Sequence, residues 1–178
     1  MPILGIIASS TLVAAGDFES IATVSVGSGG AANIEFTSIP ATYAHLQIRG
    51  IARADGNSAT IQFNSDTGSN YAYHGFFGDG SSVTAFSGTS QTKSDIMITA
   101  SGANIFSATV LDILDYANTN KYKTTRSLSG TDANGSGFLA PYSGLWMNTN
   151  AITSIKLTPF AGNFAQYTTF ALYGIKGA

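Results

Sequence analysis

The chain has 178 residues, of which 8 are Lys or Arg and 10 are Asp or Glu, and it contains no cysteine. Charged residues make up 10% of the sequence, where a soluble domain has about 25%. This scarcity excludes coiled coils and helix bundles, and the lack of cysteine excludes disulfides and thiolate metal sites. The net charge of −2 offers no basic surface for nucleic acid. A hydrophobic fraction of 44% with 11 Phe and 8 Tyr excludes a disordered chain.

The first residues, from Met1 to Ala8, are apolar, and no Lys or Arg precedes Arg49. A secretory signal needs a positive segment before its apolar run, and a membrane span needs about 20 apolar residues. We therefore expect neither a signal peptide nor membrane insertion. Residues 1–16 are interpreted as an arm that docks on a partner subunit, or alternatively packs on its own domain, and residues 17–178 as a single β-sandwich domain. The candidate docking residues of the arm are Ile3, Leu4, Ile6 and Ile7.

The dominant period along the chain is two, which is typical of β-strands. Apolar residues alternate with polar ones over 22–26 and again over 32–36. The glycine-rich segment 27–30 between them predicts a turn, so these two runs are expected to form a hairpin. The next strand, 43–53, has one face that should lie in the core and one that should be wet or covered by a partner. The predicted core face is Ala44, Leu46, Ile48, Gly50 and Ala52, and the other is Tyr43, His45, Gln47, Arg49, Ile51 and Arg53.

Further strands are expected along the rest of the chain, and 78–94 is expected to be mostly loop, broken only around 83–86. Residues 105–116 are apolar on both faces, which favours a central buried strand over a short helix. The other predicted strands lie at 61–64, 71–77, 95–100, 121–129, 144–148, 151–158 and 166–175. Ten to twelve strands with frequent turns predict an all-β, antiparallel β-sandwich with a jelly-roll-like arrangement.

A catalytic site is not indicated by the ionisable residues. His45 and His74 lack the spacing of metal ligands, and no GxSxG nucleophile motif occurs. Asp112 and Asp115 are three apart, which places them on opposite faces of a strand. We therefore expect a protein that is not an enzyme and has no cofactor and no metal site.

Aromatic residues occur beside segments rich in Asn, Ser and Gly, a composition typical of adaptable binding surfaces. Sugars stack on aromatic rings, and their hydroxyl groups exchange hydrogen bonds with polar side chains such as Asn and Ser. The candidate glycan-contact residues are Tyr71, Tyr73, Phe86, Tyr142 and Trp146. The alternative is that these rings fill the core or a subunit interface.

Four segments carry a resemblance to a known group of proteins: 5–10, 39–49, 112–124 and 170–176. Together they resemble small β-rich virion proteins of tailed bacteriophages that are common among aquatic phages. The resemblance implies a structural component of the virion, assembled in the host cytoplasm. Residues 78–94 match no part of this pattern.

These observations lead to one expected function and two alternatives. We expect a non-enzymatic, homotrimeric tail-fibre or adhesin component that contacts host surface glycans, with the threefold symmetry taken from jelly-roll virion proteins by analogy. Its expected partners are further copies of itself, other virion proteins and host glycan. The first alternative is a trimeric capsid decoration (cement) protein that stabilises the head, and the remote alternative is a glycan depolymerase.

Overall fold

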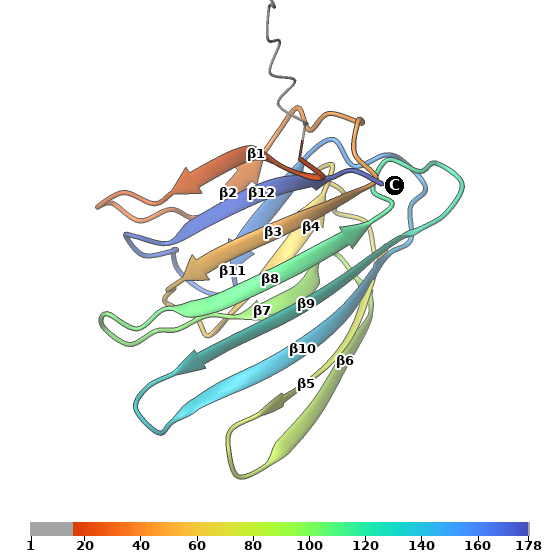
Figure 1. Ribbon diagram of the computed structural model, residues 1–178. Coiled ribbons are helices and arrows are strands. Elements are labelled where there is room, and N and C mark those ends of the chain that lie inside the picture. The colour runs from red at the N-terminus through yellow and green to blue at the C-terminus, as the bar shows by residue number, and fades with distance from the viewer. Residues whose placement is uncertain (1–15, 178) are drawn as a thin grey trace, which may run out of the picture.

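Twelve β-strands make up two antiparallel sheets in the part of the chain that the computed structural model describes, residues 16–177 (Figure 1). The strands are β1 Phe18–Ser25, β2 Ile34–Phe36, β3 His45–Ala52, β4 Ser58–Phe63, β5 Tyr71–Gly78, β6 Val83–Gln91, β7 Ser94–Ile98, β8 Ser107–Leu114, β9 Lys123–Asp132, β10 Gly137–Trp146, β11 Ile155–Pro159 and β12 Thr169–Ile175. The larger sheet has the order β1-β12-β3-β8-β9-β10-β5-β6, and the smaller has the order β2-β11-β4-β7. Within residues 16–177, no helix is long and apolar enough to cross a membrane.

The hydrophobic core lies between the two sheets, which face each other as two layers in Figure 1. On β3, Leu46 and Ile48 are fully buried, and Ile61 of β4 and Leu157 of β11 bury their side chains from the other sheet. Leu46, Ile48 and Leu157 alternate with more exposed residues, as a half-buried strand requires, whereas Ile61 follows two further buried residues in β4. The predicted all-β sandwich is therefore confirmed, and so is the predicted core face of β3.

The predicted hairpin between residues 22–26 and 32–36 is wrong. β1 pairs with β12, whereas β2 pairs with β11 in the other sheet. The glycine-rich turn carries the chain across the sandwich instead of reversing it within one sheet. At the start of this crossing the amide of Val26 donates to the carbonyl of Thr168, 2.8 Å away. The local pattern gave the strands correctly but not their partners, which lie more than 100 residues later.

Two hairpins, β5–β6 and β9–β10, make the larger sheet twice as wide as the smaller one. β6 runs over nine residues, so the prediction that 78–94 is mostly loop is wrong. β6 is an edge strand with few buried side chains, which removes the alternation that reveals a strand. Asp79 closes the hairpin by accepting hydrogen bonds from the amides of Ser81 and Ser82 at 2.8 and 2.7 Å.

β8 is central, between β3 and β9, and it forms a strand and not the alternative short helix. Its predicted burial on both faces is wrong, because Val110 and Leu114 point outward and are exposed. The inner face of β8 packs into the core through Leu111 and Ile113, but nothing covers the outer face of the larger sheet within residues 16–177. This face is the first candidate for a functional surface.

Candidate functional site

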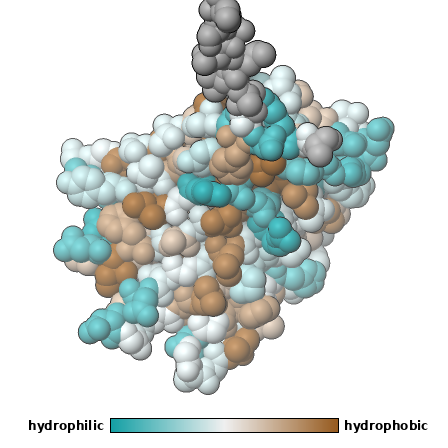
Figure 2. Space-filling model, viewed as in Figure 1, coloured by the Kyte–Doolittle hydropathy of each residue, from teal (hydrophilic) through white to brown (hydrophobic). Residues whose placement is uncertain are grey.

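Large apolar side chains lie exposed on the outer face of the eight-stranded sheet, over its central strands. Figure 2, which views the molecule from this side, shows hydrophobic residues among neutral and hydrophilic ones. We call the following set the outer apolar face: Ile51 of β3 (48% exposed), Val110 of β8 (41%), Leu128 of β9 (54%) and Leu139 of β10 (58%). Single exposed apolar residues are normal on a protein surface, but a contiguous group marks an interaction site.

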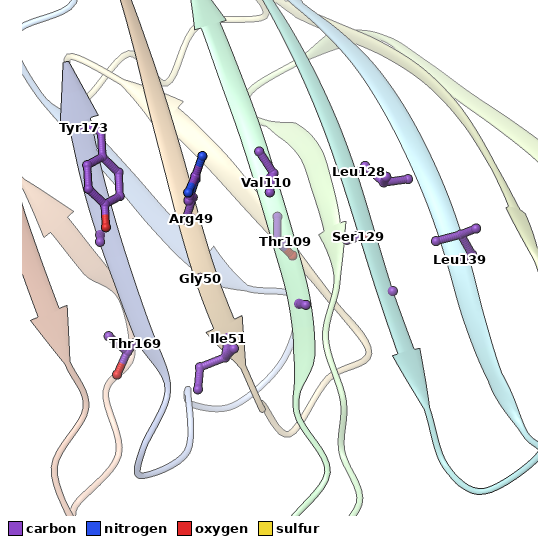
Figure 3. Close-up of a pocket in the computed structure, with 13 residues that line it drawn as sticks. Arg49, Gly50, Ile51, Thr109, Val110, Leu128, Ser129, Leu139, Thr169 and Tyr173 are labelled. Atoms are coloured by element: carbon purple, nitrogen blue, oxygen red, sulfur yellow. The ribbon is translucent and has the colours of Figure 1, made fainter. Parts of the chain in front are cut away.

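A shallow hollow of about 700 Å³ lies within the outer apolar face (Figure 3). Its origin is the register of the strands. Ile51 pairs with Ala108, and Leu139 pairs with Gly130. Ala108 and Gly130 in turn pair with each other, so two small residues lie between two large ones in one row across four strands. The two small residues, Ala108 and Gly130, form the floor of the hollow, and the side chains of Ile51 and Leu139 form its walls.

A row of polar and aromatic side chains borders this hollow along five strands. The guanidinium of Arg49 lies 4.9 Å from the ring centre of Phe18 and 5.8 Å from that of Tyr173. Arg49 Nε donates to Gln47 Oε1 at 2.7 Å. Gln47 Nε2 donates to Asp112 Oδ1, also at 2.7 Å, and Arg126 pairs with the other oxygen of Asp112 at 3.1 Å.

Two of the three charged groups in this row, Asp112 and Arg126, pair with each other, whereas Arg49 lies over the rings of Phe18 and Tyr173 and is in none of the ion pairs found within residues 16–177. Because Asp112 already binds Arg126 and Gln47, it needs no partner from outside. An apolar centre beside a polar border is the usual anatomy of a protein–protein interface. The eight strands of the larger sheet, spaced by about 4.8 Å and each about 25 Å long, give the whole sheet an area of about 960 Å², which is enough for the 800 Å² per partner of a standard interface.

A second feature lies on the inner side of the larger sheet, where it extends beyond the smaller one. β7 is the last strand of the smaller sheet, and it packs against β10 and β5. A pocket of about 260 Å³ opens at this place. We call it the aromatic pocket, and its main lining residues are Phe77, Phe86, Phe138, Tyr142, Ile98 and Asp95.

The four rings of the aromatic pocket contact one another. Ring centres lie 6.3 Å apart for Phe77 and Phe86, 5.5 Å for Phe77 and Phe138, and 5.2 Å for Phe86 and Tyr142. Gly75 makes room for this arrangement, because a Cβ there would lie 2.5 Å from the Phe86 ring. The rings come from three strands, β5, β6 and β10, so the hairpins β5–β6 and β9–β10 supply all four rings of the pocket.

Asp95 of β7 carries the carboxyl group in the lining of the aromatic pocket. Burial raises the pKa of its carboxyl group, and the Tyr73 hydroxyl and the positive charge of Lys93 only partly oppose this shift. Burial, and then the charge of Asp95, raise the pKa of Tyr73 and of Tyr142. Of the five ion pairs found within residues 16–177, none includes Asp95. The pocket therefore holds a partly buried carboxylate without a paired cation.

The predicted glycan-contact residues do not form one surface. Tyr71 and Trp146 are buried at 0% and 1% exposure, so their prediction as glycan-contact residues is wrong, whereas Tyr142 is 7% exposed and lines the aromatic pocket. Tyr73 and Phe86 are half-buried. Phe86 and Tyr142 come together in the lining of the aromatic pocket, whereas Tyr71 and Trp146 belong to the main core. The alternative reading, in which these rings fill the core, is correct for Tyr71 and Trp146.

Tyr71 and Trp146 are buried because each finds a partner for its polar group. The indole of Trp146 donates to Asp66 Oδ2 at 2.7 Å, and the Tyr71 hydroxyl accepts from the amide of Phe63 at 2.9 Å. Burial raises the pKa of Tyr71 to about 12. Burial acts to raise the pKa of Asp66 too, but hydrogen bonds from Asn70, Trp146 and Gly68 outweigh it and lower that pKa.

The remaining predicted residues are placed as follows. His45 Nδ1 accepts a hydrogen bond from the amide of Asp115 at 2.9 Å, and His74 is exposed on β5. No group of three or more His, Asp and Glu side chains gathers in a metal-binding arrangement in the described part of the chain. The arm residues Ile3, Leu4, Ile6 and Ile7 lie outside the described residues.

Sequence reasoning found part of the outer apolar face and missed the rest. It placed Arg49 and Ile51 on a face that would be wet or covered by a partner. It did not assign Leu128 to a face, since the strand over 121–129 was predicted without a register, and Leu139 lay outside the predicted strand 144–148, whereas β10 begins at Gly137. The local pattern does not reveal the outward position of Leu128, because it alternates with Ser127 and Ser129, and in the structure the two serines are the buried residues.

Comparison with known proteins gives no family for this chain. No protein-family model matches it, and neither a curated protein nor a solved structure is significantly similar to it. The resemblance to virion proteins of tailed phages therefore stays a prediction, and the case for a function depends on the two surfaces described above.

Proposed function

We propose that this chain is a structural subunit of a tailed-phage virion, a homotrimeric tail-fibre or adhesin component that assembles through its outer apolar face. The observation that carries the proposal is that face itself. Four large apolar side chains lie about half exposed around a hollow, beside a row in which Asp112 pairs with Arg126 and the guanidinium of Arg49 lies over two aromatic rings. Burying the apolar centre against a neighbour is favourable, and the charged row at its border can stay in the solvent-accessible rim of such an interface.

The order of the strands supports this proposal. Without the hairpins β5–β6 and β9–β10, the other eight strands form two sheets of four, in the orders β1-β12-β3-β8 and β2-β11-β4-β7. We interpret this order as a jelly roll in which two hairpins widen one sheet. The widening adds Leu128 and Leu139 to the outer apolar face, so the same insertion that enlarges the fold also supplies half of the proposed interface.

Contact with host glycans is proposed for the aromatic pocket. Among the described residues, this is where two of the predicted glycan-contact residues, Phe86 and Tyr142, meet an open volume. Its opening faces away from the outer apolar face, because the pocket lies on the inner side of the larger sheet. A subunit that assembles through one side of this sheet would therefore keep the pocket accessible on the other.

A capsid decoration protein is the second candidate, and the broad outer apolar face is the observation that favours it. A surface of this size is equally suited to contacts with a capsid shell. The remote alternative, a glycan depolymerase, has no such support, since Asp112 binds Arg126 and Gln47 on the outer face.

Two measurements test the proposal. Light scattering during size-exclusion chromatography should give three times the chain mass of 18.4 kDa, and a monomer at micromolar concentration would refute the assembly. Quantitative mass spectrometry of purified virions gives the copy number. A few copies to a few tens support a tail position, hundreds support the capsid alternative, and absence from the particle refutes both.

A further inference from the structure

We propose that the aromatic pocket binds a positively charged organic group, such as the ammonium of an amino sugar or a quaternary ammonium headgroup. This inference rests on the host-contact part of the proposed function and deepens it by naming the charge of the ligand. It is independent of the outer apolar face and of trimer assembly.

The rings of the pocket are the first reason. Phe77, Phe86 and Tyr142 come from three different strands and contact one another beside the open volume. The face of an aromatic ring carries partial negative charge and attracts a cation that lies within about 6 Å of its centre. Several rings around one small volume add these attractions together.

Asp95 is the second and independent reason. Its carboxylate lines the same pocket and forms none of the ion pairs found in the described part of the chain. A partly buried charge without a counter-charge is unfavourable unless something pairs with it. Lys93 is near enough to affect the carboxyl group but is not within ion-pair distance of it. A cationic ligand supplies the missing charge, whereas a neutral sugar would leave it uncompensated.

The size of the pocket limits the ligand. Its volume of about 260 Å³ is below the usual range for drug-sized sites, about 300 to 1,000 Å³. This space suits one small headgroup or one sugar residue rather than a long oligosaccharide. Ile98 forms an apolar part of the lining, which suits the methyl groups of a quaternary ammonium or the C–H face of a sugar ring.

The experiment compares matched pairs of probes by NMR titration of the isotope-labelled full chain. Choline is paired with 3,3-dimethyl-1-butanol, which has the same shape and no charge, and methyl glucosaminide is paired with methyl glucoside. We expect each cationic member to bind at least ten times more tightly than its neutral partner. The cationic probe that binds more tightly shows whether the natural ligand carries the ammonium of an amino sugar or a quaternary ammonium headgroup.

Substitutions in the aromatic pocket test whether the preference for cationic probes arises there. Asp95→Asn should reduce the preference for the cation to less than threefold, and Phe86→Leu should weaken binding of both cations at least fivefold. Glu35→Gln is the matched control, because it removes one negative charge from β2, at the opposite edge of the smaller sheet. This control should bind both cations as the unaltered chain does.

Each outcome decides a separate point. Equal binding of charged and neutral probes overturns the inference while leaving glycan contact at the pocket intact. No binding of any probe overturns both the inference and the proposed host contact, but not the assembly through the outer apolar face. Cation binding that Asp95→Asn and Glu35→Gln reduce equally would assign the effect to net charge and refute the pocket as the site.

Discussion

Replacing two leucines of the outer apolar face by threonine tests whether that face holds the subunits together. The double variant Leu128→Thr/Leu139→Thr keeps residues that favour strands, so the sheet itself should form. Both leucines are already more than half exposed, at 54% and 58%. The melting temperature of the isolated subunit should therefore change by only about 2 °C, the shift expected for a surface substitution.

The effect on assembly can be worked out from the exposed fractions. Burying a whole leucine side chain contributes about 1.5 to 3 kcal/mol, so covering the exposed half of each contributes about 0.8 to 1.5 kcal/mol. The double variant thus loses about 1.5 to 3 kcal/mol for each face. A trimer contains three faces, and the total loss of about 4.5 to 9 kcal/mol corresponds to a factor of about 10³ to 10⁶ in its overall association constant.

Sedimentation equilibrium over a range of concentrations measures this constant directly. Phe160→Thr is the control, because Phe160 is 67% exposed but follows β11 in the smaller sheet. It should leave assembly unchanged. If the double variant assembles as tightly as the unaltered chain, or if the control weakens assembly equally, the outer apolar face is not the interface.

Three further changes test the interior. Lys123→Met should lower the stability by about 3 kcal/mol, because the buried ammonium donates to three backbone carbonyls at 2.6, 3.0 and 3.0 Å. Gly50→Ala should lower the free energy of unfolding by about 1 to 3 kcal/mol, because the added Cβ would lie 2.2 Å from the ring of Phe170. Gly29→Ala is its control, since a Cβ at residue 29 meets open space. Asp95→Asn should raise the melting temperature at pH 7, because the folded state raises the pKa of Asp95 above its ordinary 3.8 and therefore favours the neutral form.

Thermal and urea unfolding check all three variants. The stability gained by Asp95→Asn should shrink as the pH falls toward 4, where the carboxyl group of the unaltered chain takes up its proton. A constant gain from pH 4 to 7 would contradict the burial of this charge. Unchanged stability of Lys123→Met would mean that its three hydrogen bonds contribute nothing, and equal losses for the two glycine variants would exclude the clash with Phe170.

The sequence was sufficient to predict the fold class and those strands in which apolar and polar residues alternate clearly. Leu46 and Ile48 were predicted in the core because neighbouring residues alone determine which face of a strand is apolar. The partner of a strand is different, since β1 pairs with a strand that follows it by 144 residues at the pair Ser25 and Thr169. No local pattern contains that information, which is why the predicted first hairpin was wrong.

The lack of long-range information in a local pattern also explains why Tyr71 and Trp146 were wrongly predicted to contact a glycan. Tyr71 and Trp146 stand beside polar, turn-rich segments, and this neighbourhood suggested an exposed position. Their rings instead pack against Phe63, at 6.3 and 5.5 Å, in the core between the sheets. The buried hydroxyl and indole are satisfied by groups that only the fold brings near, so composition could not distinguish a binding ring from a core ring.

The position of β12 has a consequence for how the chain folds. β12, the last strand of the chain, lies between the early strands β1 and β3 and pairs with both of them. A nascent or shortened chain that ends before residue 169 would leave both of those strands with open edges, which readily pair with other chains. The larger sheet therefore cannot be completed until β12 is available, and these edges stay open to pairing with other copies of the chain until then.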